Sequence, residues 1–511
     1  MEYQLKKEKC PTCETVLEAT SEQPVDLDFS LPDYCPDIER ILKCRICPSV
    51  TSKNISGDRL DVDGIAVIRL YYLDAKKQAI RICEHTSPFS CSFTLKEASQ
   101  DFVPVVRLRT EYLNCRALSP RRLDIHGAFS VCAVVYKRAF REYCCNVEGD
   151  DIQQKKHSEQ ISSLCGIGQQ QFSVSEVLDI GQGKGSPEGI LRSELNVNVH
   201  DCRAVSDKLM LKGEAVLRIL YITDIETGAQ DTMTFQIPIS QVVDVQGITE
   251  QSQNEINVDI LNYDVSLKSE YDESSTLVTL DAKLCATVWA YESQSIDVID
   301  DVYSTAYELD MTQKQTGFTR LLSVSDEMVS AKADVSITDG SITKIIDIWS
   351  DSVNSIASYE NDVLTVKGKV NCGIFALDGD GVPFYAERAV EFSVSPNVPK
   401  ELSDVRVHTC LVPVLGFRIT GNNTIEISAD IAMNAAIFEN RSCKAVTEVG
   451  AGEENKREKD KTAALTLYYA DEGESLWSIA RQYCTSVEAI RLENELSDET
   501  VNAIGMILIP M

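Results

Sequence analysis

The stretch DRLDVDGIAVIRLYYLD, residues 58–74, alternates apolar and polar side chains and passes through a glycine into a β-branched and aromatic run. This period of two predicts a β-strand with one apolar face. Two later stretches repeat the pattern: DKLMLKGEAVLRILYITD (207–224) and DVLTVKGKVNCGIFALD (362–378). Their glycines, Gly64, Gly213 and Gly368, lie about 150 residues apart, a spacing that fits whole domains in tandem and not a solenoid.

A weaker copy of the same strand follows within each repeat. The copies are RRLDIHGAFSVCAVVYKR (121–138), STLVTLDAKLCATVWAYES (275–293) and NTIEISADIAMNAAIFEN (423–440). The first keeps the glycine as Gly127, whereas the others carry Ala282 and Ala429 at that place. A position restricted to glycine and alanine in a strand indicates a crowded site or a bulge.

The strands predict a mainly β fold. A strand with one dry face must pack against another sheet or close into a barrel, so each repeat is expected to be an antiparallel β-sandwich or barrel-like domain. A small α/β unit follows them. The expected division is an N-terminal segment 1–23, β domains 24–150, 165–305 and 318–448, a linker 449–462, and a C-terminal domain 463–511.

A short helix is expected at the start of each repeat. In the first repeat, LPDYCPDIERILKC (31–44) places Pro36 and Asp37 at a helix start. Apolar residues then follow at helical spacing. The corresponding segments are SPEGILRSEL (186–195) and GSITKIIDIW (340–349). The last contains Trp349, which we interpret as a core or interdomain anchor.

The charge of the chain restricts its partners. The formal net charge is -30, which argues against binding to nucleic acid or to anionic lipid, because both need clustered basic residues. The beginning of the sequence has no apolar core of the kind a secretory signal needs, and no apolar run reaches about 20 residues. We therefore expect a cytoplasmic protein.

The 18 cysteines are expected to be reduced and packed as small apolar side chains. Two CxxC pairs, Cys10 with Cys13 and Cys44 with Cys47, are the candidates for a structural zinc site, with redox pairing as a further alternative. The gap between the pairs is longer than in common zinc ribbons. The five histidines are scattered, and neither HExxH nor Gly-x-Ser-x-Gly occurs. The sequence therefore predicts neither an enzyme nor a cofactor.

The last fifty residues predict a compact unit behind a flexible, charged linker. LTLYYA (465–470) forms a strand, and a turn at Gly473 leads to Ser475 as a helix N-cap. A second helix is expected near Ser486, and IGMILIP (504–510) forms the last strand. The order strand–helix–helix–strand gives a small two-layer unit with a shallow groove beside the first turn.

This unit resembles a LysM domain. The resemblance is carried by GESLWSIA (473–480) and by these later residues: Tyr483, Val487, Ile490, Asn494, Leu496, Gly505, Leu508, Ile509 and Pro510. It implies a groove for glycan or for a protein partner. On matching positions the groove residues are Gly473, Glu474, Ser475, Leu476, Asn494 and Leu496. Trp477 either caps the small core or contacts the ligand.

The repeats resemble the SPOCS domain of sporulation proteins, on LPDYCPDIERIL (31–42) followed by DRLDVDG (58–64). Tandem SPOCS domains before one LysM domain are similar to the SipL family of clostridial spore coat morphogenetic proteins. The resemblance implies a mother-cell scaffold at the forespore surface, whose LysM domain binds SpoIVA, the ATPase of the coat basement layer, alongside other coat proteins. The alternative is a protein that binds peptidoglycan through N-acetylglucosamine polymers.

Overall fold

The computed structural model describes residues 3–510 apart from 77, 99–100, 182, 270–275, 338–340, 362, 396–403, 453–455, 458–464, 499 and 502–503. The first repeat contains β1 (Gln4–Ser30), β2 (Ile38–Ser56), β3 (Arg59–Asp74), β4 (Ile80–Thr94), β5 (Val103–Ser119) and β6 (Arg122–Glu148). The second contains β7 (Ile152–Leu178), β8 (Gly189–Val205), β9 (Lys208–Asp224), β10 (Ala229–Asp244), β11 (Gln253–Ser269) and β12 (Thr276–Ser304). The third contains β13 (Asp310–Ser336), β14 (Lys344–Glu360), β15 (Val363–Leu377), β16 (Pro383–Val394), β17 (Asp404–Ile419) and β18 (Thr424–Gly450).

Each repeat is a sandwich of two three-stranded antiparallel sheets. In the first repeat the sheets have the orders β2-β3-β4 and β1-β6-β5, and the other two repeats use the same orders. The stretch 58–74 forms the central strand β3, and its weaker copy forms the central strand β6. Apolar residues of both sheets build one buried cluster between them. The expected mainly β fold is confirmed, and the sandwich is the form it takes.

The small-residue positions are crowded, as the sequence predicts. A Cβ atom at Gly64 would lie 2.4 Å from the carbonyl oxygen of Ser49, and one at Gly213 would lie 2.3 Å from that of Asn198. Backbone atoms cannot move aside as a flexible side chain can. Both glycines therefore allow the neighbouring strand to approach closely.

The prediction of a helix at the start of each repeat is wrong. Residues 38–44, 189–195 and 344–349 are strand in β2, β8 and β14, and Gly340 lies outside the described residues. The register shifts by one residue at Leu42, at Leu191 and at Ile346. A bulge inserts one extra residue, so the apolar side chains no longer alternate strictly and mimic helical spacing.

The three sandwiches share a buried cluster at their common centre. It consists of Leu42, Tyr71, Ile80, Leu191, Leu220, Ile222, Trp349 and Phe375. Each repeat contributes to it, and two of the bulge residues belong to it. Trp349 is 1% exposed, and its ring lies 5.0 Å from that of Phe375. The interpretation of Trp349 as an interdomain anchor is therefore confirmed.

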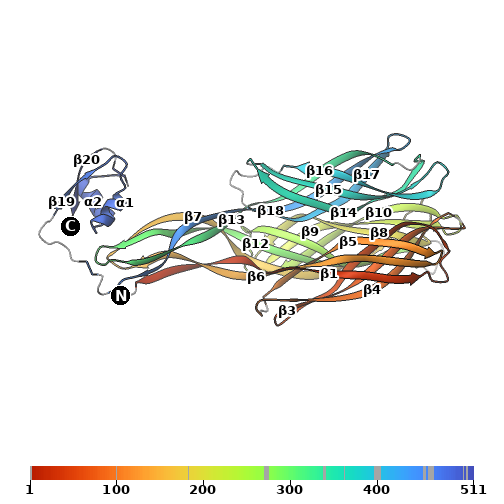
Figure 1. The fold of residues 1–511 in the computed structure, drawn as a ribbon, viewed down its shortest axis with the longest axis horizontal. Coiled ribbons are helices and arrows are strands. Elements are labelled where there is room, and N and C mark those ends of the chain that lie inside the picture. Colours follow the sequence, from red (N-terminus) through yellow and green to blue (C-terminus); the bar gives the residue numbers. More distant parts are fainter. Residues whose placement is uncertain are drawn as a thin grey trace.

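The long strands continue beyond the sandwiches as a stalk (Figure 1). β1 pairs with β6 from Gln4 to Ser30, and β7 with β12 and β13 with β18 pair in the same way. A cluster inside the stalk again draws on all three repeats, through Cys10, Tyr143, Ile161, Ile296, Val298, Phe318 and Ala445. Residues 4–23, which the sequence set apart as an N-terminal segment, are thus part of β1. The repeats likewise begin earlier than expected, at Ile152 and Asp310.

The C-terminal module lies at the far end of the stalk (Figure 1). It consists of β19 (Leu465–Ala470), α1 (Leu476–Gln482), α2 (Val487–Asn494) and β20 (Gly505–Pro510), the predicted order. β19 and β20 pair antiparallel, and Leu476, Ile479, Ile490 and Ile509 fill the core beneath them. Among the described residues, no helix combines the length and the apolar character that a membrane span requires.

Candidate functional site

The two loops of the predicted groove are joined at their base. The backbone N–H of Gly473 donates to the carbonyl of Val501 at 2.8 Å, and the N–H of Val501 donates to the carbonyl of Glu474 at 2.9 Å. Gly473 has a φ of 85°, a left-handed conformation that favours glycine. A Cβ atom added there would meet no atom within 4 Å beyond the adjoining residues. Glycine is therefore favoured at this turn by backbone geometry and not by crowding.

Glu474 is occupied within the module. Its carboxylate accepts a hydrogen bond from the Tyr468 hydroxyl at 2.6 Å and one from the backbone N–H of Asp471 at 3.2 Å. The hydrogen bond with Glu474 raises the pKa of Tyr468 to about 12. Ser475 sits at the N-cap of α1, but its side chain makes no capping hydrogen bond. Glu474 therefore fixes the first loop, and Ser475 leaves its hydroxyl for other contacts.

Asn494, Leu476 and Leu496 hold the module together. The Asn494 amide donates to the carbonyls of Ile490 and Leu508, at 2.8 Å and 2.6 Å. Its side-chain oxygen accepts from the N–H of Leu508 at 2.6 Å. Leu476 is fully buried, and Leu496 packs partly buried against the same core. These predicted groove residues therefore support the fold that the groove needs.

Trp477 lies against the stalk. Its ring meets the Tyr303 ring edge-on, with the centroids 4.9 Å apart. The indole Nε1 donates to Oδ2 of Asp301 at 2.8 Å, and the Arg481 guanidinium pairs with the same oxygen at 2.6 Å. Trp477 also packs against the core of the module. It therefore caps the core and docks the module on the end of β12 at once.

Tyr303 is the centre of this docking contact. It is 3% exposed and belongs to the buried cluster of the module, although it lies on β12. Its hydroxyl donates to the carbonyl of Thr485 at 2.7 Å, and burial raises the pKa of this phenol. Asp301 and Tyr303 carry no local signal of this role in the sequence, because their partners lie far along the chain.

The predicted linker contributes a further attachment. Val449 and Gly450 belong to β18, and the backbone N–H of Arg457 donates to the carbonyl of Ala306 at 2.9 Å. The Arg457 guanidinium contacts Sγ of Cys484 at 2.7 Å. Residues 453–455 and 458–462 of the expected linker lie outside the described residues. The described part of the linker thus follows the stalk tip and contacts the module.

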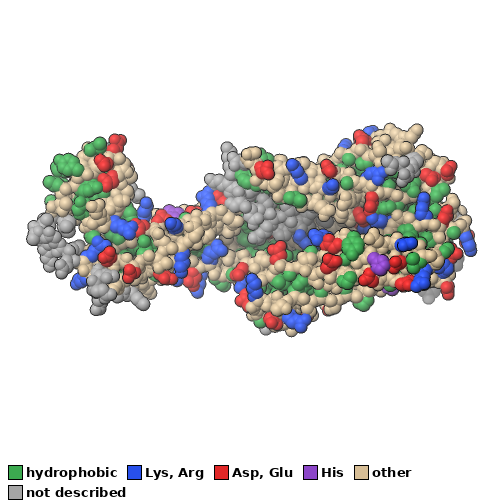
Figure 2. Space-filling model, in the orientation of Figure 1, with side chains coloured by type: hydrophobic (Ala, Val, Ile, Leu, Met, Phe, Trp, Pro, Cys, Tyr) green, Lys and Arg blue, Asp and Glu red, His purple; other side chains and the backbone are tan. Residues whose placement is uncertain are grey.

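The outer face of the two-stranded β19–β20 sheet is apolar and exposed. Leu467 is 60% exposed and Tyr469 is 76% exposed. Met506 pairs with Tyr469 on the neighbouring strand and is 55% exposed, and Leu465 continues the row. Figure 2 shows hydrophobic side chains gathered on the module. We call Leu465, Leu467, Tyr469 and Met506 the hairpin face, for the antiparallel pairing of its two strands, although α1 and α2 lie between these strands in the chain. Exposed apolar rows of this kind mark interaction surfaces.

The two CxxC pairs do not come together. Cys10 is buried in the stalk cluster, and Cys13 packs beside a different cluster, which includes Val105 and Trp289. Cys44 packs against the sandwich core of the first repeat, and Cys47 lines a cavity between repeats. Among the described residues, no group of three or more potential ligands is placed to hold a metal ion. The four cysteines therefore do not form the candidate zinc site.

Family models match three segments of the chain. The model described as SipL, SPOCS domain, matches residues 37–118 and 187–268, and the LysM domain model matches residues 468–510. The chain carries SipL-type SPOCS domains and a C-terminal LysM domain. Each SPOCS match covers the shorter strands between two long stalk strands. No curated protein and no solved structure matches the chain.

The third repeat has the same sheet orders as the two SPOCS repeats, although the SPOCS matches do not include it. The SPOCS and LysM domains make the chain a sporulation-related protein with a LysM domain. LysM domains are binding domains without catalytic function. The candidate functional site is therefore the LysM domain at the stalk tip, with one face docked and one face exposed.

Proposed function

We propose that this protein is a non-enzymatic scaffold of spore coat assembly, and that its LysM domain binds SpoIVA, the ATPase of the coat basement layer. The protein acts in the mother-cell cytoplasm and is recruited to the forespore surface, where it tethers this partner. The elongated body of three β-sandwiches offers further surfaces to other coat proteins. The LysM domain at the end of the stalk is the specific contact.

The observation that carries this proposal is the hairpin face. Leu467, Tyr469 and Met506 are each more than half exposed on one side of a two-stranded sheet. Aliphatic and aromatic side chains in a contiguous row stabilise protein–protein interfaces through their burial. A glycan needs hydrogen-bonding groups as well as a ring to stack upon, and the hairpin face offers mainly apolar contacts. A protein partner therefore fits this surface best.

The acidic charge of the LysM domain indicates which residues surround the apolar centre of the partner surface. Arg481 and Arg491 are the only basic residues between positions 465 and 511, where acidic residues are much more numerous. Arg481 is paired with Asp301, and Arg491 donates to the carbonyl of Ser497 at 2.8 Å. The partner surface accordingly has an apolar centre with lysine or arginine around it, which also increases the rate of association.

The proposal is tested by binding of the full chain to purified SpoIVA. The double substitution Leu467→Asp with Tyr469→Asp places two charges in the hairpin face, and we expect binding to be lost. The matched control is Leu492→Asp, because Leu492 is 74% exposed on α2 and its neighbour Ile490 points into the core. Equal binding by the double variant and the wild type contradicts the proposal.

A second function, binding to peptidoglycan, is supported by the LysM match and by the paired loops around Gly473 and Val501. The proposed glycan contacts are the groove residues, with the Ser475 hydroxyl as the polar group that no capping bond occupies. Sedimentation of the full chain with purified peptidoglycan tests this function. Co-sedimentation that Ser475→Val abolishes and that the hairpin double variant leaves intact supports glycan binding.

A further inference from the structure

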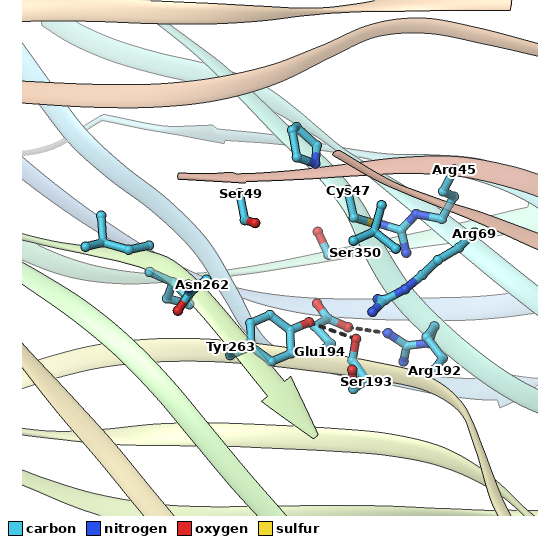
Figure 3. Close-up of a pocket in the computed structure, with 14 residues that line it drawn as sticks. Arg45, Cys47, Ser49, Arg69, Arg192, Ser193, Glu194, Asn262, Tyr263 and Ser350 are labelled. Carbon is cyan, nitrogen blue, oxygen red and sulfur yellow. Dashed lines mark hydrogen bonds and ion pairs between the residues drawn. The ribbon is translucent and has the colours of Figure 1, made fainter. Parts of the chain in front are cut away.

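A cavity of about 280 Å³ lies between the first and second repeats (Figure 3). Its walls come from β2, β3, β8 and β11, with Ser350 of β14 at one side. Three arginines line it: Arg45, Arg69 and Arg192. A larger cavity of about 510 Å³ shares Ser49 and Asn262 with it, so the two form one crevice between the repeats. Such a concentration of arginine is unusual in a chain with a net charge of -30.

Arg45 and Arg69 are direct partners across the β2–β3 pair. Like charges directly opposite each other destabilise a sheet, because their side chains project from the same face at close distance. Both side chains are largely buried, at 21% and 22% exposure, which weakens the screening by water. An anion between the two guanidinium groups would offset the repulsion between them.

The other repeats avoid this arrangement at the same position. In the second repeat the corresponding cross-strand partners are Glu194 and Arg218, which have opposite charges. In the third repeat they are Trp349 and Gly373, which are uncharged. The fold therefore does not require two cations there. The pair of like charges is a property of the first repeat alone, where it faces the cavity.

The acidic neighbours leave part of both guanidinium groups available. Arg45 pairs through Nε with Asp351 at 2.9 Å, and Arg69 pairs through Nε with Glu84 at 2.6 Å. Within the described part of the chain, the terminal nitrogens of these two arginines donate no hydrogen bond. The carboxylate that lines the cavity, Glu194, is engaged by Arg192 at 2.8 Å.

We propose that this cavity binds a small oxyanion of the phosphate or carboxylate class, held between Arg45 and Arg69. The terminal nitrogens of the two arginines donate to its oxygens, and the Asn262 amide and Ser350 hydroxyl line the same space. Because the walls belong to the first two repeats, the bound anion joins them and stabilises their contact. This site is independent of the LysM domain and of the function proposed for it.

Titration calorimetry and thermal unfolding of the full chain test the proposal. Inorganic phosphate, citrate and chloride are compared at matched ionic strength. We expect saturable binding and a higher unfolding midpoint with phosphate or with citrate, and no such effect with chloride. A phosphate response identifies a phosphate-type ligand, and a response to citrate alone identifies a polycarboxylate. The absence of saturable binding by both oxyanions contradicts the proposal.

Arg45→Gln and Arg69→Gln locate the site. Each is expected to weaken oxyanion binding at least tenfold, because one of the two guanidinium donors is gone. Arg109→Gln is the control, since Arg109 is 65% exposed on β5 and pairs with Glu111, and binding should be unchanged. If one cavity variant does not fold, the other carries the same test. Binding that both variants retain overturns the assignment.

Discussion

The two faces of the LysM domain differ in what covers them. On the α1 face, Trp477 and Arg481 contact Asp301, and the Tyr303 ring is buried in the core of the domain. On the hairpin face, Leu467 and Tyr469 are exposed. Trp477, the tryptophan of the LysM motif, therefore attaches the domain to its own chain. The apolar row of the hairpin face stays accessible.

This difference assigns attachment to the stalk and binding of a partner to two separate faces of the LysM domain. A tryptophan on the first turn of a helix in a LysM domain suggests ligand contact, but here its polar atom is already bonded to Asp301. The surface available to a partner is the one that faces away from the stalk. We therefore treat the α1 face as the attachment and the hairpin face as the proposed binding surface.

The largest expected effect comes from the hairpin face. Leu467→Asp with Tyr469→Asp should weaken partner binding at least 100-fold, because the charges would be desolvated in the interface. Circular dichroism and the unfolding midpoint should stay close to the wild type, since both side chains are exposed. Binding is measured by calorimetry or interferometry. An unaltered affinity would show that the partner binds elsewhere.

A smaller effect is expected from the docked face. Tyr303→Ala removes a buried ring and should destabilise the docking of the LysM domain by about 3 kcal/mol. The domain should then be cleaved from the stalk more readily by a protease under native conditions, while the affinity for the partner is not reduced. Tyr303→Phe keeps the ring and loses the hydrogen bond to Thr485, so it should cost only about 1 kcal/mol. Loss of partner binding in Tyr303→Ala would make the docked face part of the binding site.

The smallest effect is expected at Asp301. Asp301→Asn keeps an acceptor for the Trp477 indole but removes the charge opposite Arg481, whose side chain is 49% exposed. Because the pair is partly solvated, we expect docking to weaken by about 0.5–1 kcal/mol. The same limited proteolysis measures it, and raising the salt concentration should reduce the difference between variant and wild type. A difference as large as that of Tyr303→Ala would mean that the charge dominates the docking.

The sequence predicted antiparallel β domains, as sandwiches or barrels, because the signal for strands is local. Alternation in 58–74 and its copies gives strands with one dry face, and the LysM order follows from short segments near Gly473 and Ser486. The helix predictions failed at Leu42 and its counterparts because a bulge breaks the alternation that distinguishes a strand.

Local sequence patterns could not predict the stalk or the contact between the LysM domain and the stalk. The outer half of β1 pairs with the end of β6, and the CxxC pattern of Cys10 and Cys13 in that half gave no indication of this pairing. The contact between Tyr303 and Trp477 joins residues of two domains, and neither residue has a neighbour in sequence that indicates it. Contacts of this kind depend on the assembled tertiary structure, which a periodic pattern does not describe.

Hydroxyl-radical footprinting of the full chain, with and without SpoIVA, tests the central claim most directly, because tyrosine, methionine and tryptophan side chains are reactive probes. Tyr469 and Met506 lie on the hairpin face, and Trp477 lies on the docked face. We predict that the partner lowers the modification of Tyr469 and Met506 and leaves that of Trp477 unchanged. A change at Trp477 with none at Tyr469 and Met506 would contradict the account.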